Sequence, residues 1–407
     1  MMNLDLQYIK FCAYGFLKNL RFFDAFLLLF FLENGISFSQ IGILYAAREI
    51  ITNISEIPSG IIADSYGRKS ALLSSFLIYI LSFVAFYYST NFLLLFLGMI
   101  LFGLGDALRS GVHKGMIMDY LKLNKREEEK ISYYGSTRAW SQRGSAISAL
   151  VAGFIVLYSG NYRLIYILSV IPYLINFVNI YSYPVELNHS IKKKQRENFS
   201  AKNVVKNVIA TLKKRRVFQV VNSSALHSAF LKSIKDYIQP FLLQLAILIP
   251  VFMNMDEKNR SGLVVGVAYF FIFLLTSWAS RNSYKLLSFK IEKIELKTLM
   301  AGLFVGVVCG ISIYLEWYWL AVFFFILIYV IENLRKPILT GFLADNVSND
   351  ILTSVISTES FYKTMATSLF AIMIGVLSDY FGVGMALLAL SLFLILVTVL
   401  LDRRMAK

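Results

Sequence analysis

The sequence predicts an all-α membrane protein with twelve transmembrane helices, and three observations lead to this prediction. Of the 407 residues, 57% are hydrophobic and 16% are charged, whereas soluble domains average about 45–50% apolar and about 25% charged residues. The apolar residues form runs long enough to cross a bilayer, and basic residues gather in every second loop between those runs. This composition excludes a soluble globular, collagen-like or disordered chain.

Twelve segments contain the roughly 20 mostly apolar residues that a helix needs to cross the hydrocarbon core. Several of them contain charges, so a strict hydropathy window misses or shortens them. The predicted spans are residues 11–31, 40–62, 70–88, 92–120, 131–158, 163–183, 217–249, 261–280, 298–315, 318–340, 354–377 and 383–401. They form an N-terminal six-helix bundle (1–184) and a C-terminal six-helix bundle (217–407), separated by a basic cytoplasmic linker (185–216).

The loops predict the orientation of these spans. Loops after the even-numbered spans hold most of the loop Lys and Arg residues, whereas the opposite loops carry only Arg163, Lys258 and Arg260. Positive loops stay in the cytoplasm, so we expect both termini there and the protein in the cytoplasmic (inner) membrane. The net charge of +15 is then explained without a nucleic-acid partner, and no cleavable signal peptide is expected.

The linker contains one further pattern. Residues 200–213 place valines, an isoleucine and a leucine at helical spacing among lysines. This pattern predicts a short helix on the membrane surface that contacts anionic lipid headgroups.

Residues that form disulfides or metal sites are sparse. The two cysteines, Cys12 and Cys309, and the three histidines, His113, His189 and His227, are far apart in the sequence. They give neither a disulfide framework nor a metal-ligand spacing, and no GxxxxGK[ST] phosphate loop is present. We therefore expect no metal, no cofactor and no direct use of ATP.

The loop between spans two and three carries the most specific motif. It reads Gly60-Ile61-Ile62-Ala63-Asp64-Ser65-Tyr66-Gly67-Arg68-Lys69. The spacing G-xxx-D-xx-G-R-[RK] is matched at every fixed position and resembles the signature loop of the major facilitator superfamily. This resemblance implies two pseudo-symmetric six-helix bundles and a secondary active transporter, not an enzyme, that works by alternating access around a midplane site.

The resemblance also implies a conformational latch. The first glycine of the motif permits close approach of a neighbouring helix, and the second permits a left-handed turn. In the family, Asp64 meets the N-terminus of span eleven, here near residues 353–354, where the helix dipole favours an anion. Arg68 pairs with an acid of span four, here Asp119. The latch residues, expected to hold the cytoplasmic side closed in the outward-facing state, are Gly60, Asp64, Gly67, Arg68, Lys69 and Asp119.

Two further stretches refine the comparison with the family. Residues 103–121 resemble span four of a bacterial branch of the superfamily, but His113 and Lys114 stand where that branch often carries an acid. Span five lacks the GPxxGG antiporter motif, and its glycines at positions 135, 144 and 153 predict close helix packing instead. The two halves also resemble each other weakly, since spans five and eleven both end in paired glycines.

Charges inside the spans indicate the substrate site. Each costs at least about 2.5–3.5 kcal/mol on insertion scales and is usually retained for a transport pathway or in an ion pair. Most of these charges lie in spans one, four, seven and ten, which line the central cavity in the family, and the third, sixth, ninth and twelfth spans carry none at depth. The substrate-binding candidates are Arg21, Asp24, Arg109, His113, Lys232, Asp236 and Arg335.

Helical spacing groups some of these candidates. Asp106, Arg109 and His113 (i, i+3, i+7) fall within about a 60° sector of span four. Arg21 and Lys232 lie near mid-depth of the first helix in each half, so they are expected to face each other across the pseudo-two-fold axis. Two opposed cations suit an anionic substrate. The alternative is local neutralisation, because Lys232–Asp236 and Glu359–Lys363 are i, i+4 pairs and two i, i+3 pairs also occur.

Proton coupling is predicted from the buried carboxylates. Asp24, Asp106 and Glu332 are the candidates, and His113 is a further titratable group. Asp106 is preferred, because Arg109 and His113 share its face. Protonation of Asp106 would free Arg109 for an anionic ligand.

The sequence as a whole predicts a monomeric secondary active transporter in contact with the lipid bilayer. Its expected substrate is a small organic anion or zwitterion, moved together with protons. One alternative is an exporter of drugs or lipid-like amphiphiles, which the 34 Phe and 24 Tyr residues permit. A more remote alternative is a polytopic membrane enzyme, which the scattered histidines disfavour.

Overall fold

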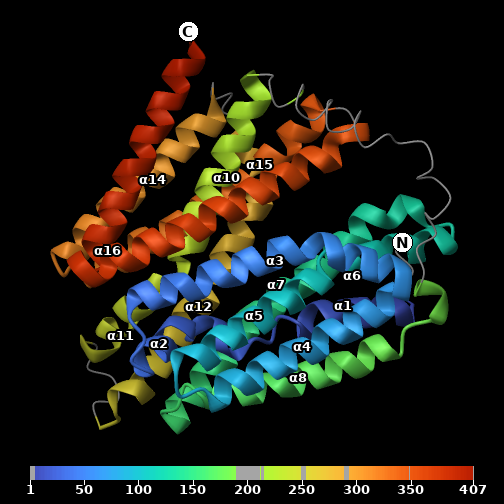
Figure 1. Ribbon diagram of the computed structural model, residues 1–407, viewed down its shortest axis with the longest axis horizontal. Coiled ribbons are helices and arrows are strands. Elements are labelled where there is room, and N and C mark those ends of the chain that lie inside the picture. The colour runs from blue at the N-terminus through green and yellow to red at the C-terminus, as the bar shows by residue number, and fades with distance from the viewer. Residues whose placement is uncertain are drawn as a thin grey trace. The chain divides into compact units, whose positions relative to one another are not determined.

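The protein is helical throughout the part of the chain that the structure describes (Figure 1). This computed structural model describes residues 5–188, 211, 215–248, 254–287, 293–347 and 349–406. The predicted surface helix at 200–213 lies outside the described residues, apart from residue 211. Within the described ranges every regular element is a helix and none is a strand, as the fold class predicts.

One compact unit comprises Met1–Asn34, Ala47–Glu197 and Ile249–Phe273. In it, α4 packs against both α5 and α8, and α1 packs against α7. The helices that lie wholly in this unit are α1 (Leu6–Leu17), η1 (Phe22–Ala25), α2 (Leu27–Glu33), α4 (Arg68–Tyr88), α5 (Phe92–Arg109), α6 (Val112–Leu123), η2 (Glu127–Glu129), α7 (Lys130–Ser159), α8 (Leu164–Tyr181) and η3 (Val185–Leu187).

The second compact unit comprises Gly35–Ala46, Asn198–Leu248 and Leu274–Lys407. In it, α10 and α14 both pack against α16. Its helices are α10 (Arg215–Ile234), η5 (Lys235–Ile238), α11 (Gln239–Leu248), α13 (Tyr284–Leu287), α14 (Ile294–Tyr314), α15 (Tyr318–Asn346) and α16 (Asn349–Ala406). Two helices belong partly to each unit, namely α3 (Phe38–Tyr66) and α12 (Glu257–Asn282). The division of the chain at 185–216 stays a prediction.

Each of the twelve predicted spans coincides with helix. The two last spans form α16, which is broken at Gly382 where φ is 78°. By length and apolar composition alone, 7 of the described helices are able to cross a membrane. The spans that fail this criterion, at residues 11–31, 40–62, 131–158 and 217–249, either carry several charges or are broken into shorter helices.

Three of the four spans expected to line the central cavity are discontinuous, whereas a single helix was expected for each of them. Span one is interrupted between α1 and η1, span four at Gly111, and span seven at η5. Gly111 has φ 71°, which glycine adopts without the steric penalty of a side chain. The i, i+7 alignment of Asp106 with His113 is therefore wrong, because the helix restarts between them. Broken helices are typical of the binding regions of transporters.

Glycines allow close helix contacts at some of the predicted places. A Cβ atom built on Gly144 would lie 2.5 Å from the Phe16 carbonyl oxygen, and one on Gly153 would lie 2.6 Å from that of Gly262. Helix backbones therefore touch at these two positions of α7. A Cβ atom on Gly60 or Gly135 would meet no described atom within 4 Å. The expected close approach is not found at either of these two glycines.

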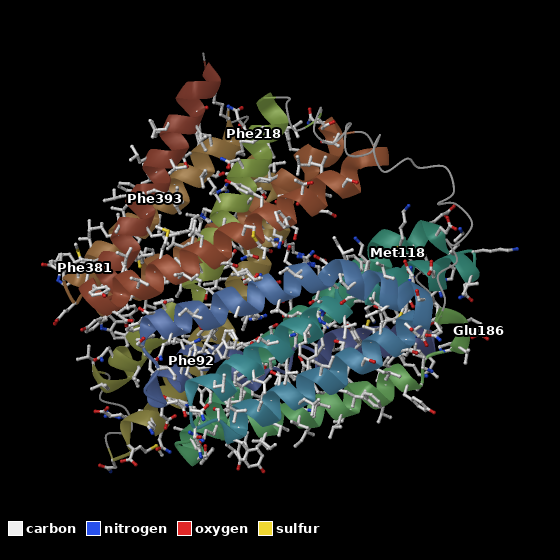
Figure 2. The ribbon with its side chains drawn as sticks, in the orientation of Figure 1. Phe92, Met118, Glu186, Phe218, Phe381 and Phe393 are labelled. Carbon is white, nitrogen blue, oxygen red and sulfur yellow. The ribbon has the colours of Figure 1, made fainter. Side chains whose placement is uncertain are left out.

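Large apolar side chains cover the outside of the helices. Phe381 and Phe393 of α16 are 65% and 45% exposed and project outward from it (Figure 2). Exposed aromatic and aliphatic side chains recur on α4, α8 and α15. Contiguous apolar surface of this kind would be costly in water and suits contact with lipid.

Candidate substrate cavity and charge clusters

Asp106, on the last turn of α5, is the centre of a cluster of three arginines. Its carboxylate oxygens lie 2.9 Å from Arg48 Nη2, 3.0 Å from Arg109 Nη2 and 3.4 Å from Arg21 Nη2. Arg21 is placed by the interruption between α1 and η1, and Arg48 comes from α3. Three cations around one carboxylate leave this cluster with an excess of positive charge. Two of the substrate-binding candidates predicted from the sequence, Arg21 and Arg109, therefore both contact Asp106.

Aromatic side chains complete this cluster. The Tyr79 hydroxyl donates to Asp106, and Arg109 Nε donates to the Tyr79 oxygen at 3.0 Å. Arg21 Nε donates to the Tyr173 hydroxyl oxygen at 2.7 Å. The guanidinium carbons of Arg21 and Arg48 lie 4.7 and 4.3 Å from the ring centre of Phe102, within the range of cation–π attraction.

Sequence reasoning missed Tyr79 and Tyr173. They belong to α4 and α8, which correspond to the third and sixth predicted spans and carry no deep charge. Their hydroxyl groups, not ionic groups, reach the cluster. Tyr79 and Tyr173 are both fully buried, and a tyrosine in an apolar span was the available signal, because a buried tyrosine hydroxyl usually finds a hydrogen-bond partner. Arg48, a charged residue of the second predicted span, was not among the site residues predicted from the sequence.

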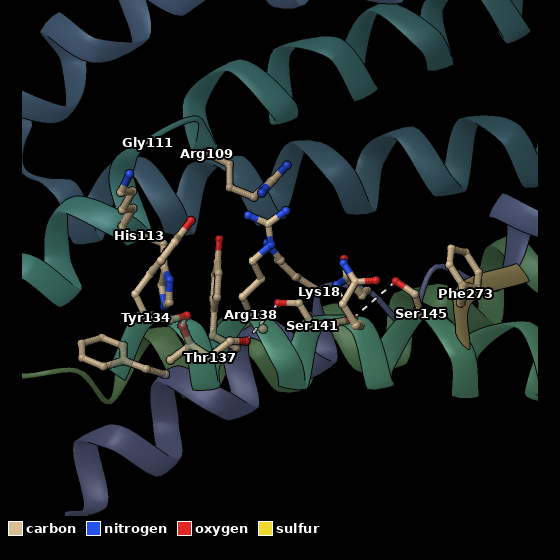
Figure 3. A pocket seen from close by; sticks show the side chains of 16 residues that line it. Lys18, Arg109, Gly111, His113, Tyr134, Thr137, Arg138, Ser141, Ser145 and Phe273 are labelled. Carbon is tan, nitrogen blue, oxygen red and sulfur yellow. Dashed lines mark hydrogen bonds between the residues drawn. The ribbon is translucent and has the colours of Figure 1, made fainter. Parts of the chain in front are cut away.

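A cavity of about 430 Å³ opens beside this cluster. Its walls come from α1, α6, α7, Phe273 of α12 and the break between α5 and α6. Figure 3 shows the side chains that line it. Such a volume is at the lower end of the range of about 300–1,000 Å³ that small-molecule sites occupy. The cationic and histidine side chains in its lining are Lys18, Arg109, His113, Lys114 and Arg138.

None of the sixteen residues that line the cavity is acidic. Arg109 and Arg138 reach into it from opposite walls (Figure 3). Arg109 is paired with Asp106, whereas Lys18, Lys114 and Arg138 form no ion pair with any described residue. Lys18 and Lys114 lie over the rings of Tyr14 and Tyr134, at 5.6 and 5.3 Å. The cavity is therefore electropositive and suited to a negatively charged ligand.

His113 lies at the wall of the same cavity. Its ring stacks on Tyr14 with centres 3.6 Å apart and planes 10° apart, and its Nε2 lies 3.4 Å from the Tyr183 hydroxyl. The restart of the helix at Val112 places it there, away from Asp106. Arg109 and His113 thus share a cavity although they do not share a helix face.

A smaller hollow adjoins the cavity. It is lined by Arg21 and Asp24 together with Asn19, Ser145 and Phe273, and these last three residues also line the larger cavity. Two predicted substrate residues are therefore next to the cavity rather than in its wall. The facing of Arg21 and Lys232 across the pseudo-two-fold axis stays a prediction.

The second unit contains a different charged cluster. Glu332 of α15 lies 2.8 Å from Nδ1 of His227, which is fully buried, and it accepts a hydrogen bond from the Ser228 hydroxyl. No hydrogen-bond partner of His227 Nε2 is present in the described part of the chain, and this atom faces Gly302 of α14. His227 had been set aside as an isolated histidine, and no sequence signal connects it to Glu332 across 105 residues.

The remaining candidates of this unit line neither the cavity nor the smaller hollow described above. Arg335 is 1% exposed, and its Nη2 donates to the Ser223 hydroxyl at 2.7 Å and to the Glu295 carbonyl at 3.1 Å. Asp236 is 3% exposed and lies 3.7 Å from Lys235 Nζ. The structure therefore encloses Arg335 and Asp236, and their predicted contact with substrate stays a prediction, as does that of Lys232.

The signature loop forms a compact charged turn. Arg68 Nη1 lies 2.5 Å from Asp119 Oδ2, so the structure brings together the two residues that the family resemblance pairs. Gly67 has φ 102°, a conformation that favours glycine. Lys69 Nζ donates to the Tyr183 carbonyl at 2.9 Å.

Asn188, which the sequence analysis did not single out, caps this turn. Its carbonyl accepts from the Arg68 amide at 2.7 Å, and its side-chain oxygen accepts from the Lys69 amide at 3.1 Å. These amides begin α4 and have no partner within the helix. The start of the predicted linker is thereby attached to the signature loop.

Comparisons with known proteins agree with this architecture. The sequence model of the Major Facilitator Superfamily matches residues 15–363. A Bacillus subtilis (strain 168) protein described as the uncharacterized MFS-type transporter YxaM is 24% identical over 383 residues, which cover 93% of this chain and 90% of that protein.

Solved structures of transporters share the fold. The nucleoside transporter NupG has a TM-score of 0.72 at 14% identity, covering 99% of this chain and 100% of that one. A bacterial homologue of the human lysosomal transporter Spinster has a TM-score of 0.71 at 15% identity, covering 99% and 98%. The D-xylose-proton symporter has a TM-score of 0.63 at 13% identity, covering 95% of each chain. Because the family model covers most of the sequence, the chain belongs to the Major Facilitator Superfamily and is a multi-pass membrane transporter rather than an enzyme.

Proposed function

We propose that this transporter moves a small organic anion together with protons, by alternating access. The electropositive cavity beside the Asp106 cluster carries the substrate part of this proposal. Its lining contains four Lys and Arg side chains and one histidine but no carboxylate. A charge-assisted hydrogen bond from arginine or lysine to an anion is stronger than a neutral one. An anionic group would therefore bind here in place of water.

The same lining argues against the alternatives. The ammonium group of a zwitterion would find no acidic partner among the sixteen lining residues, and a cationic drug would be repelled. A lipid-like amphiphile needs a mostly apolar wall, whereas three cations here have no ion pair to neutralise them. Among the substrate classes predicted from the sequence, the anion is the one that this cavity favours.

The experiment compares two arginines of α7. Purified protein is screened by thermal shift against carboxylates, phosphate esters, amino acids and cationic drugs, and counterflow of a labelled hit is then measured in liposomes. We expect anionic hits, and we expect Arg138→Gln to lower their affinity at least tenfold. Arg143→Gln is the matched control, because Arg143 lies over Trp140 at 4.8 Å and does not line the cavity. Cationic hits, or equal effects of the two variants, would contradict the proposal.

Proton coupling is assigned to Glu332 and His227. A carboxylate and an imidazole 2.8 Å apart share one hydrogen-bonded proton site, and histidine is the side chain that titrates most readily near neutral pH. Asp106 is a weaker candidate, since its three arginines compensate the ionised carboxylate. One solved structure of the same fold is a proton symporter by its description, which supports coupling to protons.

The test of coupling separates exchange from accumulation. Glu332→Gln is expected to abolish proton-driven accumulation in liposomes while counterflow, which needs no net proton movement, continues. Glu359→Gln is the matched control, because Glu359 also accepts from a serine of α10, at 2.6 Å, but has no histidine partner. Accumulation that survives in Glu332→Gln, or that is lost equally in Glu359→Gln, would rule out this assignment.

We also propose an orientation of the protein in the membrane and a conformational latch formed by the signature loop. We infer from the basic loops that both termini are cytoplasmic, in the inner membrane. The Arg68–Asp119 pair at 2.5 Å supports a latch that includes Gly60, Asp64, Gly67 and Lys69. Labelling of engineered cysteines at both termini with an impermeant reagent tests the orientation, because only inside-out vesicles should react.

A further inference from the structure

The segment at 375–382 repeats the spacing of the signature loop at 60–67. Both read G-xxx-D-xx-G, and Asp379 stands in the place of Asp64. The second glycine breaks the helix in both, with φ and ψ of 102° and 144° at Gly67 and of 78° and 160° at Gly382. The same backbone geometry therefore follows α3 and interrupts α16, with a carboxylate three residues before each break.

Asp379 uses its carboxylate to cap the beginning of α3. Oδ1 accepts from the Phe38 amide at 2.9 Å, and Oδ2 accepts from the Ser39 amide at 2.8 Å. The first amides of a helix have no partner within it, and the positive end of the helix dipole attracts an anion. Ser37 and Gln40 already form a capping box at the start of α3, in which the Ser37 hydroxyl accepts from the Gln40 amide at 3.3 Å. A residue of α16 thus satisfies two further amides that this capping box leaves without a partner.

Two glycines bring the backbones of these helices into contact beside the cap. A Cβ atom on Gly42 would lie 2.3 Å from the Ala371 carbonyl oxygen, and one on Gly375 would lie 2.4 Å from that of Phe38. At the other end of α3, a Cβ atom on Gly60 would meet no described atom within 4 Å. One end of α3 is therefore tightly packed, whereas Gly60 near its other end has open space.

The helix α3 is divided between the two compact units. Its first residues, up to Ala46, belong to the second unit, and from Ala47 onward it belongs to the first. Phe38 and Asp64 are about 39 Å apart along the axis at 1.5 Å per residue, close to the full thickness of a bilayer of about 40–45 Å. The two repeated motifs therefore act at opposite membrane surfaces, at the two ends of one helix.

We propose that Asp379 is a positioning residue of the transport cycle, which holds the start of α3 against α16 while that surface is closed and releases it when that surface opens. The segment 375–382 is thereby a second latch, on the surface predicted to face outward. This inference needs no assumption about the substrate, so it can fail without affecting the proposed anion transport.

The test measures which surface is open. Reporter cysteines are introduced singly, as Ala371→Cys and as Gly60→Cys, in a background in which the buried Cys12 and Cys309 are replaced by alanine. Full-length protein in right-side-out and inside-out vesicles is treated with an impermeant maleimide. Ala371 is fully buried, whereas Gly60 is exposed, so labelling without further substitution is expected to be slow at 371 and fast at 60.

Asp379→Asn is expected to raise the labelling rate at position 371 about tenfold and to lower it at position 60. Asp379→Glu, which keeps the carboxylate, is expected to restore most of the original pattern. Glu316→Gln is the matched control, since Glu316 is an exposed acid in another loop predicted to face outward. Unchanged rates in Asp379→Asn would overturn the proposal, and so would a rise at 371 without a fall at 60, which would mean local loosening only.

A second variant leaves Asp379 intact. In Gly375→Ala, the added Cβ would collide with the Phe38 carbonyl oxygen and push α3 away from α16. The same reciprocal change in labelling is expected. If Gly375→Ala leaves both rates unchanged while it remains folded in a thermal unfolding assay, the contact does not control the opening.

Discussion

The two carboxylate clusters of this transporter, around Asp106 and around Glu332, have opposite surroundings. Asp106 is surrounded by three arginines, one of which lines an open cavity. Glu332 accepts hydrogen bonds from one histidine and one serine and lines neither the cavity nor the smaller hollow. In the first cluster the carboxylate is outnumbered by permanent cations, whereas in the second its partner can lose its charge.

In our proposal this difference gives the two units different roles: the first binds the anion and the second binds the proton. Permanent positive charge next to a cavity attracts and binds an anion. An enclosed carboxylate with a titratable partner is the arrangement that can gain and lose a proton at moderate cost. Pseudo-symmetric bundles therefore need not carry equivalent chemistry at equivalent depths.

The largest difference in unfolding free energy between the two clusters is expected when their carboxylates are removed. Asp106→Ala leaves three arginines without their acid, and breaking a buried ion pair costs about 3–5 kcal/mol. Glu332→Ala leaves a histidine that can become neutral and one nearby arginine, Arg335, that keeps its hydrogen bonds to the Ser223 hydroxyl and the Glu295 carbonyl. We therefore expect a smaller loss of about 1–3 kcal/mol, as for a broken buried hydrogen bond. Unfolding free energies in detergent check this order. A loss in Glu332→Ala as large as that in Asp106→Ala would break the comparison.

A smaller effect is expected where His227 packs against α14. In Gly302→Ala the new Cβ would lie 2.0 Å from His227 Nε2, and overpacking costs about 1–3 kcal/mol. The displaced imidazole should also weaken proton-driven accumulation more than counterflow. Gly341→Ala is the control, because a Cβ atom there meets nothing within 4 Å. Equal accumulation by the two variants would separate His227 from coupling.

The smallest change in unfolding free energy is expected from a substitution that removes one hydroxyl group of the Asp106 cluster. Tyr79→Phe removes the hydroxyl that contacts Asp106 and Arg109, and we expect a loss of about 1 kcal/mol in unfolding free energy. Tyr237→Phe should cost nothing, since no hydrogen-bond partner of its buried hydroxyl is present among the described residues. Thermal unfolding of both variants gives the measurement. Equal stability would show that the arginines alone hold Asp106.

The sequence predicted the helical segments because bilayer thickness imposes a fixed length of apolar residues on each crossing. All twelve predicted spans coincide with helix, and the family follows from the signature loop at 60–69 together with them. The breaks in spans one, four and seven were not predicted, because the polar residues at each break also fit a continuous amphipathic helix. Only Gly111, in the left-handed conformation, was a usable signal for a break.

For the candidate site, the sequence by itself determined which residue types are available: cations outnumber acids in the spans expected to line the cavity, and Arg109 and His113 do line one cavity. The tertiary structure decided which charges meet. Arg48 and Tyr79 reach Asp106 from 58 and 27 residues away, and His227 reaches Glu332 from 105 residues away. Local spacing determines a helix face, but pairing across helices depends on how the helices pack, and no periodicity within a single span records that.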